Sequence, residues 1–300
     1  MEFAGEQLTL SIFIQILTVA LTFTGFIVAL VTYKARTNQN RAEWTASLIG
    51  EFLLHERNVS VRRNLELFYE ERLNNYIQAV LSGDNPLIHC SPEEIQASRE
   101  LEDFLAQLEF FCYLESRGTI STTDLDASLG FWLGFFKEER FIALRAYLQE
   151  NSFEYLVERL GGEIQLNRIL VYGTLKSGTQ KHREFGLDKC TKSLGMFEIP
   201  GEMFAVNSQY PGANVNLEVL FSNFKVSKFE TFTCELLEID SARANVNELL
   251  QKLDDYENEG EVQEYRRYLI PCAGHAAWVY DYIESTEMHE RIESGVWDKR

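Results

Sequence analysis

The pattern of apolar residues changes at Gly161-Gly162, and this change divides the chain into two kinds of structure. Before the two glycines, apolar side chains recur every three or four residues, which is the spacing of one face of an α-helix. After them, short runs rich in β-branched and aromatic residues are separated by Gly, Pro, Asn and Ser, which is typical of strands joined by turns. Because two glycines end a helix and let the chain change direction, we place a domain boundary there.

The segment before the boundary, residues 34–161, is expected to form a bundle of helices. Its clearest apolar stripe consists of Leu101, Phe104, Leu105, Leu108, Phe111 and Cys112. A helix start precedes the stripe at Ser91-Pro92, where the serine can cap and the proline occupies the first helical position. The sequence identifies no partner of this region and leaves open whether it mediates oligomerisation.

The segment after the boundary, residues 162–300, is expected to form a curled antiparallel β-sheet or barrel with few helices, so the predicted fold class is α+β. The expected strands lie at about 169–172, 202–206, 216–220, 233–239, 265–270 and 276–282. Residues 240–255 are the exception in this segment. There the residues Val246, Leu249, Leu250 and Leu253 follow the spacing of a helix.

Near the start of the chain, residues 7–33 form a run of 27 without a formal charge that is rich in Leu, Ile, Val and Phe. A helix of that length measures about 40 Å, more than the ~30 Å hydrocarbon core of a bilayer, so we interpret it as a single transmembrane helix. Basic residues follow the run at Lys34, Arg36 and Arg41 and none precedes it, which predicts that the remaining domains are cytoplasmic. The alternatives are a buried helix and a cleaved signal peptide, although a signal peptide expects a basic start and a shorter apolar core.

Charge and cysteine usage argue against several classes of partner. A net charge of −18 repels phosphate backbones, so we expect no nucleic-acid binding. The histidines His55 and His89 have no partner ligands at metal-binding spacing, so no metal site is predicted. The five cysteines lie far apart without a Cys-x-x-Cys pair and are interpreted as reduced thiols; they are Cys90, Cys112, Cys190, Cys234 and Cys272.

Two stretches carry the candidate chemistry. Arg168 to Leu175 is a run of β-forming residues interrupted by Gly173, which predicts a buried strand that stops at a sharp turn. Main-chain N–H groups without ladder partners can face a ligand at such a turn. Leu253 to Glu257 places a carboxylate at the end of the predicted helix. We expect the two stretches to meet, the first binding a carboxylate or carbonyl and the second moving a proton.

These stretches belong to a series of seven segments that resembles, in the same order, the gamma-glutamylcyclotransferase-like family. The segments are Tyr172 to His182, Tyr210 to Gly212, Cys234 to Asp240, Leu253 to Glu257, Tyr265 to Arg267, Ala277 to Tyr280 and Ile292 to Trp297. A motif such as Tyr-Gly-Thr-Leu is weak by itself, but seven in order over about 130 residues are specific. The resemblance covers about Leu166 to Arg300 and does not extend to the first half of the chain.

The resemblance implies an enzyme, a transferase or lyase, that cyclises the gamma-glutamyl group of a small molecule to 5-oxoproline and releases an amine or amino acid. Together with the predicted span at residues 7–33, this would be a membrane-anchored enzyme. It implies no metal, nucleotide or redox cofactor. Glu257 matches the family's catalytic glutamate, which acts as general base and then as general acid. The matching substrate-binding positions are Tyr172, Gly173, Thr174 and Leu175 in the turn, with Tyr210 and Tyr265 shaping the pocket.

The sequence leaves alternatives open for both the catalytic residue and the function. The family has a glycine directly after its glutamate, whereas Asn258 and Glu259 precede Gly260 in this chain, so Glu259 is the alternative acid. Glu257 is favoured because Leu253 to Glu257 aligns with the family motif without a gap. The remaining alternative, that both glutamates are solvated loop charges, is outweighed only by the match of all seven segments. The chain could also be a membrane-anchored metabolite sensor, a stress or defence effector that binds without turnover, or a scaffold with a vestigial pocket. Its natural substrate and pathway are not evident from the sequence.

Overall fold

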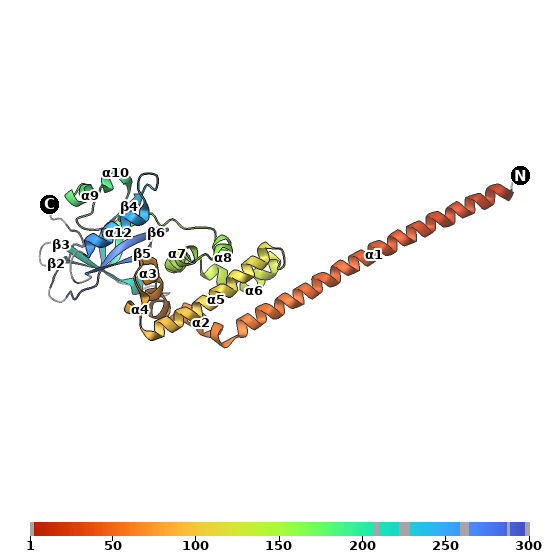
Figure 1. Ribbon diagram of the computed structural model, residues 1–300, viewed down its shortest axis with the longest axis horizontal. Coiled ribbons are helices and arrows are strands. Elements are labelled where there is room, and N and C mark those ends of the chain that lie inside the picture. The colour runs from red at the N-terminus through yellow and green to blue at the C-terminus, as the bar shows by residue number, and fades with distance from the viewer. Residues whose placement is uncertain (1–2, 207–209, 222–228, 259–263, 287–288, 298–300) are drawn as a thin grey trace.

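The computed structural model shows a long N-terminal helix, a group of shorter helices and a C-terminal region built on a β-sheet (Figure 1). The structure describes residues 3–206, 210–221, 229–258, 264–286 and 289–297, and within them every side chain except those of residues 3–23, 38 and 71.

Helices make up the first part of the chain, as the three- and four-residue spacing predicts. They are α1 (Phe3–Leu54), α2 (Glu56–Leu67), the π-helical η1 (Glu70–Asn74), α3 (Asn75–Ser82), α4 (Pro86–His89), α5 (Pro92–Ser116), α6 (Thr122–Phe135), the 3-10 helix η2 (Glu139–Phe141), α7 (Ile142–Glu150) and α8 (Glu154–Arg159). The predicted cap of α5 is present, because the Ser91 hydroxyl accepts from the Glu94 N–H and the Glu94 carboxylate accepts from the Ser91 N–H. The apolar stripe of α5 is buried in the centre of the group.

The first helix contradicts the predicted membrane span at residues 7–33. Of the helices in the described part of the chain, none is both long enough and apolar enough to cross a bilayer. Residues 7–33 instead begin the 52-residue helix α1, which continues unbroken through Lys34, Arg36 and Arg41 (Figure 1). The single-pass membrane localisation inferred from that span is therefore wrong, and the orientation argument that depended on it no longer applies.

The structure gives residues 7–33 no boundary of their own, because α1 continues beyond them to Leu54 through a second half that carries Lys34, Arg36, Arg41 and Glu43.

A curled, mixed sheet organises the C-terminal region. Its strands are β1 (Arg168–Val171), β2 (Thr191–Val206), β3 (Tyr210–Val215), β4 (Thr231–Ile239), β5 (Tyr265–Cys272), β6 (His275–Tyr282) and β7 (Glu290–Arg291). The strand order is β3-β2-β4-β1-β6-β5, and β7 pairs with β2. The central strand β1 runs antiparallel to β4 but parallel to β6. The expected antiparallel barrel is thus corrected to a mixed half-barrel within the same α+β class.

Helices α9 (Gln180–Glu184), α10 (Leu187–Cys190), α11 (Leu217–Phe221) and α12 (Val246–Glu257) complete this region. The strand predicted at 216–220 is wrong, because α11 occupies that segment. The side-chain oxygen of Asn216 accepts from the Val219 N–H at 3.0 Å, so this asparagine starts a helical turn where its apolar neighbours suggested a strand. The predicted helix at 240–255 corresponds to α12, which starts later, at a cap formed by Asn245.

The two faces of the sheet pack against different helices. Alternate residues of a strand point to opposite faces. Leu170 accordingly joins the apolar core shared with the N-terminal helices, whereas Ile169 and Val171 pack in the cluster that contains Leu250 and Leu253 of α12. The central strand β1 is therefore buried on both faces, and its end is held rigidly.

The edge strand β5 is covered by helix α3 rather than by another strand. The buried side-chain amide of Gln78 donates to the Leu269 carbonyl and accepts from the Leu269 N–H, both at 2.8 Å. The Ser82 hydroxyl donates to the Arg267 carbonyl at 2.6 Å. A sheet edge presents unpaired N–H and C=O groups, and here the N-terminal helices satisfy them.

We expect Gln78→Leu to destabilise the protein by about 2–4 kcal/mol, because it leaves both main-chain groups of Leu269 buried without partners. The change in unfolding free energy is measured by urea denaturation. The control is Gln96→Leu on the exposed surface of α5, for which we expect a change of less than about 0.5 kcal/mol. Equal effects of the two substitutions would show that the Gln78 amide does not hold the sheet edge.

Candidate active site

Where β1 ends, the chain leaves the sheet in a tight turn at Tyr172 to Leu175. The Lys176 N–H donates to the Gly173 carbonyl at 3.2 Å, which closes the turn. Gly173 lies against Pro211, and a Cβ atom built on it would fall 2.4 Å from the Pro211 Cγ. Among the described residues, no acceptor pairs with the main-chain N–H groups of Gly173, Thr174 or Leu175. These N–H groups are therefore available as donors to a ligand.

Helix α12 carries Glu257 as its last residue. The helix packs on the sheet through Leu249, Leu250 and Leu253. Its last turn is held by Asp254, which accepts a hydrogen bond from the Tyr280 hydroxyl at 2.7 Å and pairs with Arg267 at 2.9 Å. Because both partners of Asp254 lie on strands, the end of α12 is fixed relative to the sheet.

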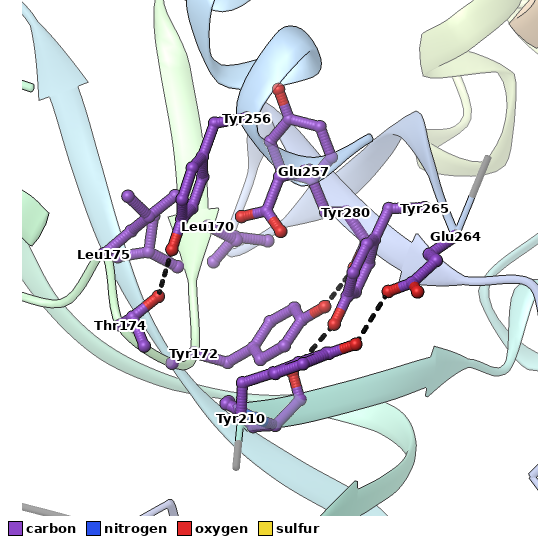
Figure 2. A pocket seen from close by; sticks show the side chains of 13 residues that line it. Leu170, Tyr172, Thr174, Leu175, Tyr210, Tyr256, Glu257, Glu264, Tyr265 and Tyr280 are labelled. Atoms are coloured by element: carbon purple, nitrogen blue, oxygen red, sulfur yellow. Dashed lines mark hydrogen bonds between the residues drawn. The ribbon is translucent and has the colours of Figure 1, made fainter. Parts of the chain in front are cut away.

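A cavity of about 220 Å³ lies between the turn and the end of α12. Its lining consists of Leu170, Val171, Tyr172, Gly173, Thr174, Leu175, Tyr210, Pro211, Tyr256, Glu257, Glu264, Tyr265 and Tyr280. Figure 2 shows the Glu257 carboxylate pointing into this space. The structure thus brings the early turn and the late acid together across an open volume large enough for an amino-acid-sized group.

The environment of Glu257 disfavours its charged form. Burial, followed by the negative charges of Asp254 and Glu264, raises the pKa of Glu257 from 4.5 to about 8. Some of the side-chain surface remains open to the cavity. A carboxyl group with such a pKa exchanges protons readily near neutral pH, which is the property of a general base and acid.

Tyrosine hydroxyls fix the other walls of the cavity. Tyr172 donates to the Tyr280 carbonyl at 2.8 Å, and Tyr265 donates to the Pro211 carbonyl at 3.1 Å. Tyr210 donates to the Glu264 carboxylate at 2.8 Å (Figure 2). Burial, followed by the bond to Glu264, raises the pKa of Tyr210 to about 12, so its hydroxyl stays protonated. These rings are held as rigid walls.

The structure places all of the sequence-predicted site residues in the lining of this one cavity. They are Tyr172, Gly173, Thr174, Leu175, Tyr210, Glu257 and Tyr265. Their individual roles stay predictions. Glu259, the alternative acid, lies outside the described residues.

Sequence reasoning missed several residues that build the site. Glu264 and Tyr256 line the cavity. Tyr256 belongs to the motif Leu253 to Glu257 but was given no role, and Glu264 falls outside all seven segments. Glu235 is buried and accepts from the Ser177 N–H at 2.7 Å, which anchors the chain just after the turn. A signal for Glu235 was present, since it is a charged residue in the middle of the apolar strand β4.

Comparison with known proteins identifies the C-terminal region. Residues 169–299 match the family model described as "Gamma-glutamyl cyclotransferase, AIG2-like". This part of the chain belongs to that family. No curated protein sequence matches the chain.

Several solved structures are similar to the same region. Protein ytfP from Escherichia coli is 30% identical, with 43% of this chain and 95% of that chain covered and a TM-score of 0.30. Protein PH0828 from Pyrococcus horikoshii is 23% identical, with 44% of this chain and 89% of that chain covered and a TM-score of 0.31. An AIG2-like protein from Mus musculus is 20% identical, with 45% of this chain and 89% of that chain covered and a TM-score of 0.29.

Proposed function

We propose that the C-terminal region cyclises the gamma-glutamyl group of a small molecule to 5-oxoproline and releases an amine or amino acid. The observation that carries this proposal is the placement of the Glu257 carboxylate across a cavity from the unpaired N–H groups of the turn at Gly173. Membership of the cyclotransferase family supports the same reaction class.

In this reaction the α-amine of the gamma-glutamyl group attacks its own side-chain carbonyl carbon. A C–N bond forms to close the five-membered lactam, and the C–N bond to the leaving amine breaks. No water is consumed. Because the nucleophile and the carbonyl belong to one molecule, holding the substrate in a folded conformation removes much of the entropic cost of the attack.

Glu257 moves the proton that this exchange requires. An α-ammonium group has a pKa near 8 and becomes nucleophilic only after it loses a proton. The pKa of Glu257, about 8, is close to that value, so the carboxylate can take the proton and then give it to the leaving nitrogen. One partly buried carboxyl group can thus serve both steps in succession.

The turn at residues 172–175 holds the substrate in position. Its N–H groups can bind the substrate α-carboxylate or the oxyanion that develops on the attacked carbonyl. The rigid walls formed by Tyr172, Tyr210 and Tyr265 favour a compact, folded substrate over an extended one.

The direct test of this proposal is to incubate the purified full-length protein with gamma-glutamyl dipeptides and gamma-glutamyl amines and to measure products chromatographically. We expect 5-oxoproline and free amine in equal amounts. Release of glutamate in place of 5-oxoproline would identify a hydrolase. Saturable binding without any product would favour the sensor and contradict the proposed turnover.

We expect kcat/KM to rise with pH through a value of about 8, because Glu257 must lose its proton to act as the base. The substrate amine titrates in the same range, so a second measurement is needed. Asp254→Asn removes a charge that raises the pKa of Glu257, and we expect it to move the rise in kcat/KM to lower pH. A profile that does not move would assign the titration to the substrate alone.

A further inference from the structure

The candidate cavity carries two carboxylates, and no basic side chain among the described residues lines it. One of the two acids, Glu257, is assigned to proton transfer in the proposed function. The other, Glu264, helps to raise the pKa of Glu257 but is assigned no contact with the substrate in that chemistry. A second acid raises the cost of charging the first, so its presence beside Glu257 calls for a compensating role.

Glu264 is held firmly in its place. Its main-chain carbonyl accepts from the Ile283 N–H at 2.9 Å, just beyond the paired ends of β5 and β6. Its carboxylate accepts from the Tyr210 hydroxyl at 2.8 Å. Within the described residues, no Lys, Arg or His forms an ion pair with this carboxylate. Its negative charge at the cavity wall is therefore left for a ligand to neutralise.

The position of Glu264 shows which part of a substrate it would contact. In Figure 2, Thr174 and Glu264 lie on opposite sides of the cavity, with Glu257 between them. In the proposed function the turn around Thr174 binds the gamma-glutamyl head, and Glu257 faces the reacting nitrogens. The leaving group then extends away from the turn, toward Glu264 and the ring of Tyr210.

We propose that Glu264 is a specificity-determining residue that selects gamma-glutamyl conjugates whose released amine carries a second positive charge. This inference rests on the proposed function. An ammonium group beyond the scissile nitrogen would pair with the Glu264 carboxylate, and the neighbouring rings of Tyr210 and Tyr265 offer further attraction to a cation. A carboxylate at the same point of the leaving group would be repelled.

The overall charge of the protein acts in the same direction. With a net charge of −18, its surroundings attract cations and repel anions over a range set by the salt concentration. This effect changes the rate of encounter for any cation, whereas the contact with Glu264 acts only inside the cavity. Substitution of this one residue separates the two contributions.

The test uses three conjugates of similar length in which gamma-glutamate is linked to butylamine, to 1,4-diaminobutane or to 4-aminobutyrate. Their leaving groups are neutral, cationic and anionic. For the full-length protein we expect kcat/KM for the cationic conjugate to exceed that for the neutral one by roughly tenfold, the size of a charge-assisted contact at a partly exposed site. We expect the anionic conjugate to be the poorest substrate.

Two substitutions tie this preference to Glu264. Glu264→Gln should bring the ratio of cationic to neutral kcat/KM close to one, and Glu264→Lys should favour the anionic conjugate. The matched control is Glu284→Gln, which removes an exposed acid outside the cavity lining and should leave the ratio as it is in the wild type. Thermal unfolding of each variant checks that it folds.

A ratio that Glu264→Gln and Glu264→Lys leave unchanged would overturn the proposal, as would a wild-type protein that does not distinguish the three charges. Neither result would contradict the proposed cyclisation, because formation of 5-oxoproline from the neutral conjugate tests that reaction separately. Absence of 5-oxoproline from all three conjugates would instead overturn the proposed function, and this inference with it.

Discussion

Glu257→Gln is expected to lower kcat for 5-oxoproline formation by about 10²–10⁴-fold, the usual contribution of a positioned general acid and base. Glutamine keeps the size and the hydrogen-bonding shape of the side chain but cannot accept the amine proton. Substrate binding, measured by calorimetry, should change by only a few fold, because the N–H groups at Gly173 remain in place. An unchanged kcat would remove Glu257 from the reaction and leave Glu259 as the acid.

Glu257→Gln is also expected to change the way in which folding stability depends on pH. The pKa of Glu257 in the folded protein, about 8, lies above its ordinary value of 4.5. Between these values the folded state binds more protons than the unfolded state, so this group destabilises the protein as pH rises. Glutamine has no such penalty, so the stability of the variant relative to wild type should increase with pH across this window.

The matched control for Glu257→Gln is Asp255→Asn, on the same helix. Asp255 is exposed and does not line the cavity. We expect its substitution to change kcat by less than about twofold, as for an exposed surface position. A large loss in this control would mean that the activity responds to any charge change on α12, and the specific role of Glu257 would be lost.

Gly173→Ala is the second substitution with a large expected effect. The new Cβ would lie 2.4 Å from Cγ of Pro211, closer than atoms can pack, and 3.2 Å from its Cδ, which is also tight, so the turn or the proline must move. A displacement of about 1 Å in a substrate-positioning group can cost 10²-fold in rate, and we expect a loss of that order in kcat/KM. Overpacking should also cost about 1–3 kcal/mol of stability, measured by urea denaturation.

A second substitution tests whether the clash with Pro211 is the cause. Pro211→Ala removes the Cγ and Cδ atoms, so the double variant Gly173→Ala/Pro211→Ala should recover part of the activity and stability lost in the single variant. Gly134→Ala is the matched control. Its Cβ meets nothing within 4 Å in helix α6, and we expect it to be neutral or slightly stabilising. Strictly additive losses in the double variant would contradict the packing explanation.

The periodic features of the chain were predictable from the sequence because periodicity reports directly which side of an element is buried. The stripe of α5 and the helical spacing of Leu249, Leu250 and Leu253 both correspond to buried faces. The strand at 169–172 was likewise evident from its β-forming residues, and it forms β1. The parallel pairing of β1 with β6 was not evident from the sequence, because strand direction depends on the path of the connecting chain.

Features that depend on a single side chain escaped the sequence analysis. Asn216 starts helix α11 through one hydrogen bond, whereas the apolar residues after it fit a strand equally well. The extent of α1 was not evident either, because the helix continues past the uncharged run at residues 7–33 as far as Leu54.

In the candidate site, too, some residues were evident from sequence motifs and others only from their contacts in the structure. The order of seven motifs located the turn at Gly173 and the acid at Glu257, and the fold brings both to one cavity. Glu264 could not be found from the sequence, and Glu235 was marked only by its charge within an apolar strand. Their importance comes from contacts with Tyr210 and Ser177, residues that lie more than fifty positions away along the chain.

The central claim is that the substrate's own amine attacks its side-chain carbonyl while Glu257 moves the proton. The most direct test is to run the reaction in ¹⁸O-labelled water and to analyse the products by mass spectrometry. Intramolecular attack retains the original carbonyl oxygen, so the account predicts unlabelled 5-oxoproline. Label in 5-oxoproline, or labelled glutamate as the product, would show that water is the nucleophile and would contradict it.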